Sequence, residues 1–185
     1  MLTNPSAVHT VEFRGVQALY DLAPGDRTAQ MLGFTMCSAT VSVYSRPEEL
    51  SPRESSCVML RSLGLPRATI AQTMGLSTDT VITHLNRSYR NLGVTGMSAL
   101  PHYLLAKDHF RIDQYGDPLY ISPAERRVIQ TGISGATNAQ IAQQLGLSPP
   151  TVRHHWANAA ARNQANNREV LIMRELLSGV MVEVD

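Results

Sequence analysis

The sequence predicts an all-α protein: two tandem four-helix domains, each containing a helix-turn-helix, preceded by a short N-terminal segment. This prediction depends on an internal repeat, because a shift of 71 residues aligns two parts of the chain without a gap. The first part begins with LSPRE at residue 50 and continues with ATIAQTMGLSTDTVITHL from residue 68. The second begins with ISPAE at residue 121 and continues with AQIAQQLGLSPPTVRHHW from residue 139. A repeat this regular indicates one fold unit that is used twice.

The repeat also predicts the domain boundaries. A chain of 185 residues can form one domain of ordinary size or two small ones, and the repeat favours two. We expect the first domain at 50–107 and the second at 121–177, with an N-terminal segment at 1–49, a linker at 108–120 and a tail at 178–185. Domains this small bury a modest fraction of their surface, so we expect each to pack against its neighbour.

Residues 1–49 show the weakest pattern. Val11–Leu22 could form a short helix, and Pro24-Gly25-Asp26 is a turn signal. Thr28–Tyr44 could form a helix that leads into the first repeat, but the β-branched residues near its end favour a strand almost as strongly. Pro47 is expected to end this element.

The first repeat begins with a helix-capping signal. Ser51 can cap a helix, Pro52 suits its first position, and Glu54 completes a capping box. Apolar residues, among them Cys57, then recur at helical spacing until Gly64–Pro66 ends the helix. The following helices are expected at Arg67–Met74, Thr78–Leu92 and Gly96–Lys107.

The second repeat follows the same plan. Gly75 and its equivalent Gly146 suit the left-handed turn between the second and third helices, since glycine lacks a Cβ. Ser77 and Ser148 are placed to cap the third helices. Helices are expected at Pro123–Gly132, Asn138–Leu145, Pro149–Ala165 and Asn167–Leu177.

The net charge of +1 conceals an uneven distribution. Residues 50–107 carry six basic and two acidic side chains, and residues 121–177 carry six basic and three acidic ones. The three remaining segments are each acidic overall. Basic repeats between acidic segments suit contact with nucleic acid by the repeats, although solvated charged faces are also common.

Several classes of protein are disfavoured. No apolar run approaches a membrane span and no signal peptide is apparent, so we expect a cytoplasmic protein with no membrane partner. Cys37 and Cys57 are too few for a disulfide framework, and Cys57 is expected to be buried. No reaction-bearing motif is present, so we expect no enzyme activity and no cofactor. We also expect no metal, because the spacing of the histidines His102, His109, His154 and His155 matches no ligand pattern.

The string S-P-R-E … I-A-x-x-M-G-L-S-x-x-T-V-x-x-H … L-G-V resembles the LuxR-type (GerE-like) DNA-binding domain of bacterial transcription regulators. The resemblance covers residues 50–107 and the first three-quarters of 121–177, where Asn163-Gln164-Ala165 replaces L-G-V. It implies that the third helix of each domain enters the major groove of double-stranded DNA. Sigma-factor region 4 has a related helix-turn-helix, but T-V-x-x-H favours the LuxR type.

The resemblance also implies which residues contact DNA. Thr80 and Thr151 would bind phosphate. The outward positions that follow them are Ile82, Thr83 and Asn86 in the first repeat and Arg153, His154 and Ala157 in the second, with Arg87, Arg90 and Asn158 nearby. Arg153 could contact guanine and Asn86 adenine, whereas Arg87 and Arg90 could contact phosphate. Ile82 departs from the usual lysine and could face a thymine methyl or a protein partner.

Two histidines and the tryptophan are expected at structural positions. His84 and His155 lie where the family histidine packs near the DNA backbone, and Trp156 is expected in the core or between domains. In this family the fourth helix forms homodimers, so Met97, Leu100 and Leu104 join Ile82 as candidates for a partner interface. The alternative is that the two fourth helices pack together within one chain.

Two functions therefore remain in competition. The first is a sequence-specific DNA-binding transcription regulator whose tandem modules act as an internal pseudo-dimer or as half of a larger dimer. The second is a protein-interaction factor, acting on another regulator or on RNA polymerase, in which one module has lost DNA binding. No signal-receiving domain fits into 1–49, so control must come from abundance, a partner or this short segment.

Overall fold

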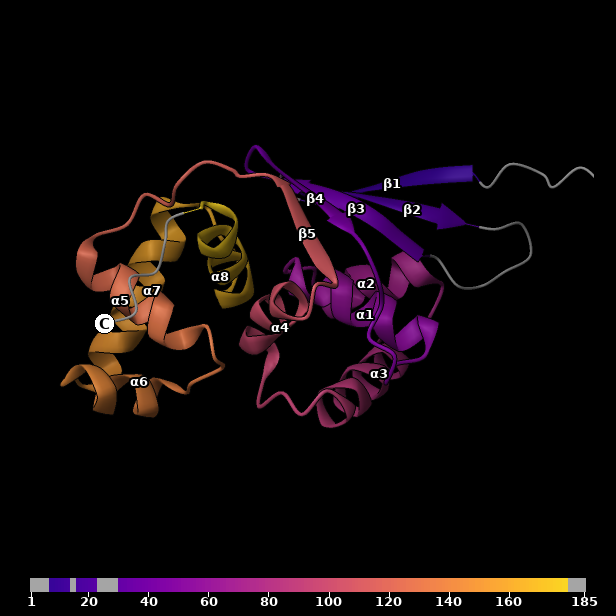
Figure 1. Ribbon diagram of the computed structural model, residues 1–185. Coiled ribbons are helices and arrows are strands. Elements are labelled where there is room, and N and C mark those ends of the chain that lie inside the picture. Colours follow the sequence, from indigo (N-terminus) through magenta and orange to yellow (C-terminus); the bar gives the residue numbers. More distant parts are fainter. Residues whose placement is uncertain (1–6, 14–15, 23–29, 180–185) are drawn as a thin grey trace, which may run out of the picture.

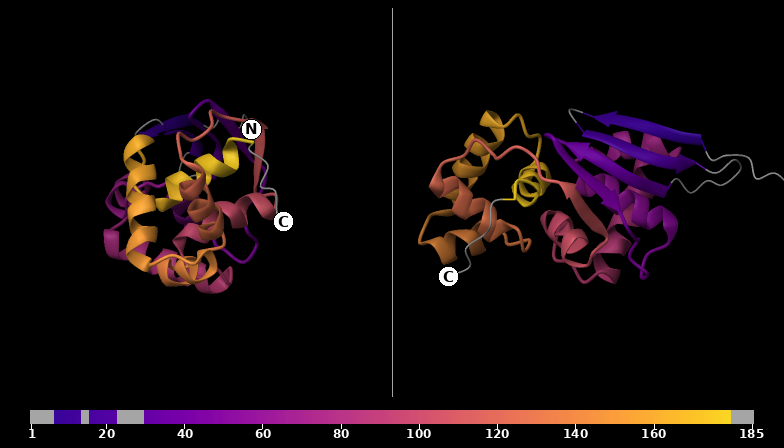
Figure 2. Two further views of the ribbon diagram at one scale, coloured as in Figure 1. Left: turned by 90° about the vertical axis from the view of Figure 1, so that its left-hand side faces the viewer. Right: turned by 45° about the horizontal axis from the view of Figure 1, so that its top comes forward.

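The computed structural model describes residues 7–13, 16–22 and 30–179, and it places a sheet over the helices of the first repeat with the second repeat beside them (Figures 1 and 2). The protein is therefore a mixed α/β structure, and the all-α prediction is wrong. Within the described residues, five antiparallel strands pair in chain order: β1 (Ala7–Phe13), β2 (Val16–Leu22), β3 (Gln30–Met36), β4 (Ala39–Val43) and β5 (Phe110–Gln114).

The N-terminal segment accounts for most of this sheet. The short helix expected at Val11–Leu22 is wrong, since the described residues of this stretch belong to β1 and β2, which pair from Ala7 with Leu22 to Phe13 with Val16. The strand alternative for Thr28–Tyr44 is confirmed, as the two strands β3 and β4. In β4, burial alternates over Ala39, Thr40 and Val41, as period-two side-chain placement requires. The Pro24-Gly25-Asp26 turn lies outside the described residues.

The sheet and the first repeat share one hydrophobic core. Phe34 of β3 and Phe110 of β5 are 2% exposed, and their rings meet edge to face at 5.2 Å between centroids. Met31 and Val41 enter the same core as Leu60 of the first helix. Because β5 follows the first repeat and pairs with β4, the sheet joins segments on both sides of that repeat.

The helices lie close to their expected positions. The first repeat forms α1 (Pro52–Ser62), α2 (Arg67–Met74), α3 (Thr78–Asn91), a short 3-10 turn η1 (Met97–Ala99) and α4 (Leu100–Ala106). The second forms α5 (Pro123–Gly132), α6 (Asn138–Leu145), α7 (Pro149–Arg162) and α8 (Arg168–Leu177). The capping boxes of Ser51 with Glu54 and Ser122 with Glu125 are both present, and Gly75 and Gly146 adopt the expected left-handed conformation.

The two repeats are joined through their fourth helices, α4 and α8, which pack against each other in the middle of the molecule (Figure 1). Helix α8 belongs to two cores. Its Met173 and Leu177 enter the core of the sheet and first repeat, whereas Leu171 and Ile172 enter the core of the second repeat. The second of the two expectations for the fourth helices, packing within one chain, is therefore the arrangement observed.

The contact between repeats has a twofold pattern. A Cβ added to Gly64 would lie 2.2 Å from Val170 Cγ2, and one added to Gly135 would lie 3.1 Å from Ala99 Cβ. The 71-residue shift relates Gly64 to Gly135 and Ala99 to Val170, so each repeat presents the same backbone turn to the same position of the other. This reciprocity is the property of a twofold, isologous interface.

The polar contacts between the repeats do not share this symmetry. Arg61 pairs with Glu169 at 3.1 Å, and both side chains are at most 10% exposed. Asn167 Nδ2 also donates to the Gly64 carbonyl oxygen at 3.0 Å. The positions related to the ion pair by the 71-residue shift are Gly132 and Ser98, which carry no charge. The geometry is therefore twofold, while the ion pair lies on one side only.

Candidate nucleic-acid interface

Helix α3 has a buried face and a free face. Ser77 caps it by accepting from the Thr80 backbone N–H at 3.1 Å, and Val81, Leu85 and Ser88 are buried against α1 and α2. These positions recur at helical spacing, so the opposite side of α3 faces solvent. A two-turn α2 joined to α3 by a left-handed glycine holds this helix in the helix-turn-helix arrangement.

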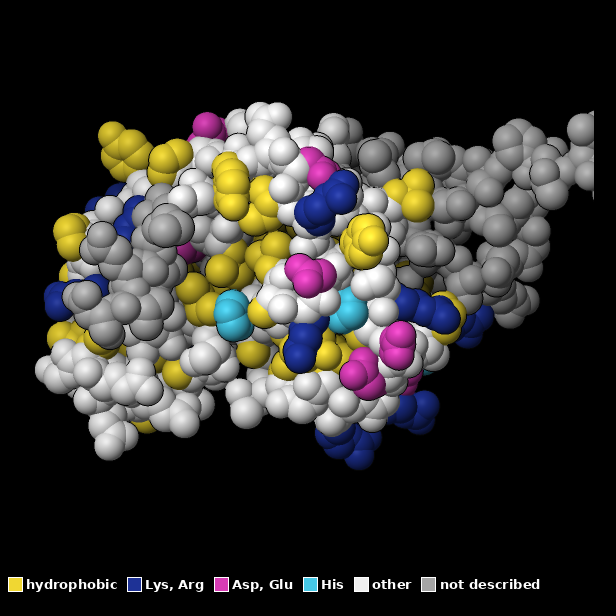
Figure 3. Space-filling model, viewed as in Figure 1, with side chains coloured by type: hydrophobic (Ala, Val, Ile, Leu, Met, Phe, Trp, Pro, Cys, Tyr) yellow, Lys and Arg dark blue, Asp and Glu magenta, His cyan; other side chains and the backbone are white. Residues whose placement is uncertain are grey.

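The free face of α3 carries most of the residues expected there. Thr83, Asn86, Arg87 and Arg90 are exposed, whereas Ile82 is half-buried. The Thr83 hydroxyl donates to the Asp79 carbonyl oxygen at 2.9 Å, and the Arg90 Nε–H to the Asn86 carbonyl oxygen at 3.4 Å. In Figure 3, dark-blue basic side chains project from the lower edge of the molecule, where Figure 1 places α3. The face is polar and basic toward its C-terminal end.

Helix α7 presents a different set of side chains from the same framework. Its buried face contains Val152, Trp156 and Ala159. Arg153, His154 and Ala157 are exposed, and Asn158 is half-buried. Arg153 has no ion-pair partner within the described part of the chain. A free guanidinium at the N-terminal part of an exposed helix can reach guanine or phosphate without first breaking a protein contact.

The two threonines occupy equivalent places at the start of their helices. The Thr80 and Thr151 hydroxyls each lie 2.8 Å from the hydroxyl of the capping serine, Ser77 or Ser148. Both threonines are half-buried. A hydroxyl at this position lies beside the positive end of the helix dipole, where phosphate binds favourably.

An arginine of each exposed helix contacts the capping-box glutamate of the same repeat. Arg87 lies 3.8 Å from Glu54, and Arg162 pairs with Glu125. Burial of the Glu54 carboxyl acts to raise its pKa, but the hydrogen bonds from Ser51 and the charge of Arg87 outweigh burial and hold this pKa below its usual value. Arg87 is 60% exposed, so it can contact phosphate while remaining near Glu54.

The histidines and tryptophan lie mainly inside the helical packing. His84 and His155 are half-buried, and the buried Nδ1 of His84 has no hydrogen-bond partner among the described residues. Trp156 is 6% exposed in the core of the second repeat, with the Arg168 guanidinium 4.4 Å from its ring. No cluster of histidine, cysteine or acidic residues in the described ranges could hold a metal ion.

The expected partner-interface residues need a correction. Leu100 and Leu104 are fully buried in the core that includes the sheet, because α4 packs against α8 of the same chain. They cannot form an exposed dimer surface. Met97 is half-buried at the contact between repeats, where its sulfur accepts from the Arg61 Nε–H at 3.3 Å. Of the four candidates, Ile82 alone lies on the helix face that points away from this contact.

The second repeat lacks the L-G-V of the motif and has Asn163 where that string would begin, and the contacts of Asn163 explain this change. The Asn163 side chain accepts from the Tyr120 backbone N–H at 2.8 Å and donates to the Tyr120 and Ala159 carbonyl oxygens at 3.1 and 2.8 Å. It fastens the start of the second repeat to the end of α7. In the first repeat, Asn91 donates to the Glu49 carbonyl oxygen at 3.4 Å, and the 71-residue shift relates Glu49 to Tyr120. The sequence analysis missed both contacts, although Asn163 was marked by its departure from the motif.

Comparison with known proteins follows the repeat. The family described as bacterial regulatory proteins, luxR family, matches twice, at residues 48–104 and 120–174. The transcriptional regulatory protein FixJ of Bradyrhizobium diazoefficiens is 33% identical over 61 residues, which are 33% of this chain and 30% of that protein. FixJ of Azorhizobium caulinodans is 37% identical over 60 residues, 32% of this chain and 28% of its own length.

These relatives share only part of their length with this protein, since the chain spans less than a third of each. No solved structure matches the chain. Among the described helices, none has the length and apolar character needed to cross a membrane.

Proposed function

Because the chain belongs to the luxR family of bacterial regulatory proteins, we propose that it is a sequence-specific DNA-binding transcription regulator that uses both helix-turn-helix units as an internal pseudo-dimer. The observation that carries this proposal is the twofold contact between the repeats, in which Gly64 meets Val170 and Gly135 meets Ala99. Proteins with two helix-turn-helix units bind two half-sites on one face of DNA, and twofold symmetry of the protein is matched by symmetry of the site.

A preset arrangement of the two units has a direct energetic consequence. Each unit alone makes a small number of DNA contacts. When one unit binds, the second lies at high effective concentration near its own half-site, so the chain binds more tightly without new contacts. The buried Arg61–Glu169 pair and the two-core helix α8 restrict movement between the units, so less freedom is lost on binding.

We assign different tasks to the two exposed helices. Arg153 on α7 supplies a bidentate donor for guanine, with His154 beside it. Asn86 on α3 suits adenine, whereas Arg87 and Arg90 suit phosphate and therefore position the domain without selecting a sequence. Thr80 and Thr151 contact phosphate at the two helix starts.

A protein-interaction factor is the second candidate, and one observation favours it. Ile82 is half-buried and occupies the position of Arg153, and the exposed carboxylate of Asp79 lies one turn before it. An acidic and an apolar side chain at the start of a recognition helix weaken attraction to phosphate. In this alternative, α3 contacts another regulator or RNA polymerase while α7 binds DNA.

The experiment that separates these functions is selection from a random duplex pool at two salt concentrations. The intact protein is compared with Thr80→Val, Thr151→Val and the control Thr131→Val. The hydroxyl of Thr131 donates to the Arg127 carbonyl oxygen within α5. A two-part motif that loses one half in each of the first two variants supports the pseudo-dimer. One half-site that is lost only with Thr151→Val supports the alternative, and no selected sequence with any form overturns both.

A further inference from the structure

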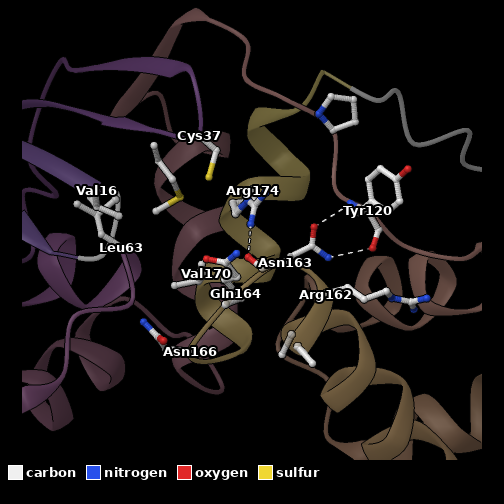
Figure 4. A pocket seen from close by; sticks show the side chains of 15 residues that line it. Val16, Cys37, Leu63, Tyr120, Arg162, Asn163, Gln164, Asn166, Val170 and Arg174 are labelled. Atoms are coloured by element: carbon white, nitrogen blue, oxygen red, sulfur yellow. Dashed lines mark hydrogen bonds between the residues drawn. The ribbon is translucent and has the colours of Figure 1, made fainter.

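A cavity of about 930 Å³ opens between the sheet and the second repeat (Figure 4). Val16 and Met36 of the sheet and Leu63 at the end of α1 form one wall. The opposite wall consists of the C-terminal part of α7 and the facing side of α8, with Tyr120 at the rim. The volume lies within the range of small-molecule sites, about 300–1,000 Å³, and such sites prefer the junction of domains.

The lining divides into an apolar part and a polar part. Val16, Met36, Leu63 and Val170 supply aliphatic and thioether surface. The polar part, which Figure 4 shows nearer α7 and α8, includes Arg174. A cavity with this division suits a molecule that has a polar head and an apolar body.

The charge of the lining is one-sided. Arg162 and Arg174 are its charged residues, and no aspartate or glutamate lies among the described residues that line it. Arg162 is already paired with Glu125. Arg174 has no carboxylate partner within the described part of the chain: one of its amino groups donates to the Asn163 carbonyl oxygen at 2.7 Å, and its buried Nε–H has no acceptor.

A half-buried guanidinium without a counter-ion is unfavourable unless something compensates its charge. From this charge, the volume and the divided lining, we propose that the cavity is a binding site for a small amphiphilic anion. Its carboxylate, sulfonate or phosphate group pairs with Arg174, and its apolar body lies against the sheet and Leu63. Nothing in the proposed DNA interface uses this cavity, since it lies at the end of α7 that is remote from Arg153.

The site connects parts that belong to different repeats. A molecule in it contacts the sheet, which shares a core with the first repeat, and α7 and α8 of the second repeat. Binding therefore changes the stability of the contact between the two repeats, which holds the recognition helices α3 and α7 apart. An effect on DNA affinity rests on the proposed function, whereas the binding of the anion does not.

The direct test uses two fluorescent probes of similar shape and different charge. Anilinonaphthalene sulfonate carries the anionic group, and phenylnaphthylamine lacks it. Titrations are made with the intact protein, Arg174→Met, Ala161→Trp, which places a large side chain on the lining, and the control Arg111→Met on the exposed part of β5. Circular dichroism of each variant establishes that it is folded.

Cys37 supplies an independent readout. It lies on the lining and is half-buried, so the rate of its alkylation by iodoacetamide reports occupancy of the cavity. Cys57 does not interfere, because it is fully buried and burial raises its pKa to about 12. Mass spectrometry of the modified residue separates the two thiols.

We expect one molecule of the sulfonate to bind per chain and to slow alkylation of Cys37. Arg174→Met should lower the affinity for the sulfonate about tenfold or more, because one charge-assisted contact is lost. The affinity for the neutral probe should change little. Ala161→Trp should lower the affinity for both probes, and Arg111→Met should change neither affinity.

If Arg174→Met does not fold, Gln164→Glu provides a second test, because it adds a negative charge to the lining. It should lower the affinity for the sulfonate alone. Equal sulfonate affinity in all folded variants, or unchanged alkylation of Cys37, overturns the proposal.

Discussion

The two repeats have the same inner surfaces and different outer ones. Both have a capping box, a left-handed glycine and a third helix capped by serine. On the outside, α7 presents a free Arg153, whereas α3 has a half-buried Ile82 at that position and Arg87 and Arg90 further along. Packing and capping dictate the inner positions, while the exposed positions can change without cost to the fold. Under the proposed function, we expect Arg153 on α7 to discriminate bases more strongly than any side chain on α3.

The contact between the repeats shows a similar contrast. Its backbone geometry is twofold, but the ion pair of Arg61 with Glu169 has no counterpart at Gly132 and Ser98. The side that contains Gly64 is therefore stabilised by a buried ion pair, and the side that contains Gly135 by close packing against Ala99. Each variant is therefore compared with a matched change elsewhere in the chain.

The largest effect is expected at the buried ion pair. Glu169→Gln leaves the Arg61 guanidinium buried without a counter-ion, and we expect a loss of about 3–5 kcal/mol in the free energy of unfolding. Urea unfolding measures it. Ser98→Ala changes the related position and should leave stability nearly unchanged. Equal losses for both variants would show that the ion pair adds nothing specific to the contact.

The glycines that face the other repeat should rank next. Gly64→Ala has a left-handed backbone and a Cβ only 2.2 Å from Val170, whereas Gly75→Ala has a similar backbone and nothing within 4 Å. Backbone strain costs about 1–2 kcal/mol in both, and overpacking adds about 1–3 kcal/mol for Gly64→Ala alone. Thermal unfolding should place Gly135→Ala between them. A loss no larger for Gly64→Ala than for Gly75→Ala would mean that the repeats separate at little cost.

On DNA, Arg153→Ala should reduce the preference for one sequence, whereas Arg90→Ala should reduce the affinity for every sequence. Loss of a bidentate arginine removes about 1–3 kcal/mol of base discrimination. Loss of Arg90 should weaken binding to all sequences alike. It should also reduce the salt slope, the dependence of log affinity on log salt concentration, by about one. Titration of a selected duplex and its single-base variants at several salt concentrations distinguishes them. An unchanged preferred sequence in Arg153→Ala would place the wrong face of α7 in the groove.

The exchange at Ile82 tests the first repeat directly. Ile82→Lys adds a cation where α7 carries Arg153, and the salt slope should become steeper by about one if α3 lies against phosphate. Equilibrium titration measures the slope, with Thr131→Lys on α5 as the control for added charge. A slope that changes equally in both variants would remove α3 from the DNA interface.

The smallest effect concerns acid stability. The folded-state pKa of Glu54 is lowered, so its contribution is present above the unfolded value of about 4.3 and is lost as pH falls through the folded value. In Glu54→Gln, the free energy of unfolding should therefore depend less on pH in the acid range. The exposed Glu48→Gln is the control. Urea midpoints between neutral and acid pH provide the measurement, and an unchanged slope in Glu54→Gln would contradict the assignment.

The sequence contained enough local information to predict the helices but not the sheet. Capping serines, first-turn prolines and left-handed glycines act within a few residues, which is why α2, α5 and α6 were predicted to the residue. The sheet depends on pairing between β4 and β5, about 70 residues apart, and residues 110–114 gave no signal of their own. Short apolar runs such as Val11–Leu22 fit helix and strand alike until a pairing strand is known.

The candidate site shows the same limit. The exposed positions of α3 and α7 followed from the motif, and the structure exposes Thr83, Arg90 and Arg153 as expected. The burial of Leu100 and Leu104 could not be predicted, because it depends on α8 of the other repeat. The Arg61–Glu169 pair spans 108 residues and has no local signal.

In the proposed function, one chain positions two recognition helices at a fixed separation on DNA. The mass bound to duplexes that carry the two selected half-sites at a series of spacings measures this separation. A fixed separation predicts one chain per duplex and highest affinity at a single spacing, with a steep decrease when two or three base pairs are inserted, since about 10 base pairs make one turn of DNA. Two chains per duplex, or affinity that does not depend on spacing, would contradict it.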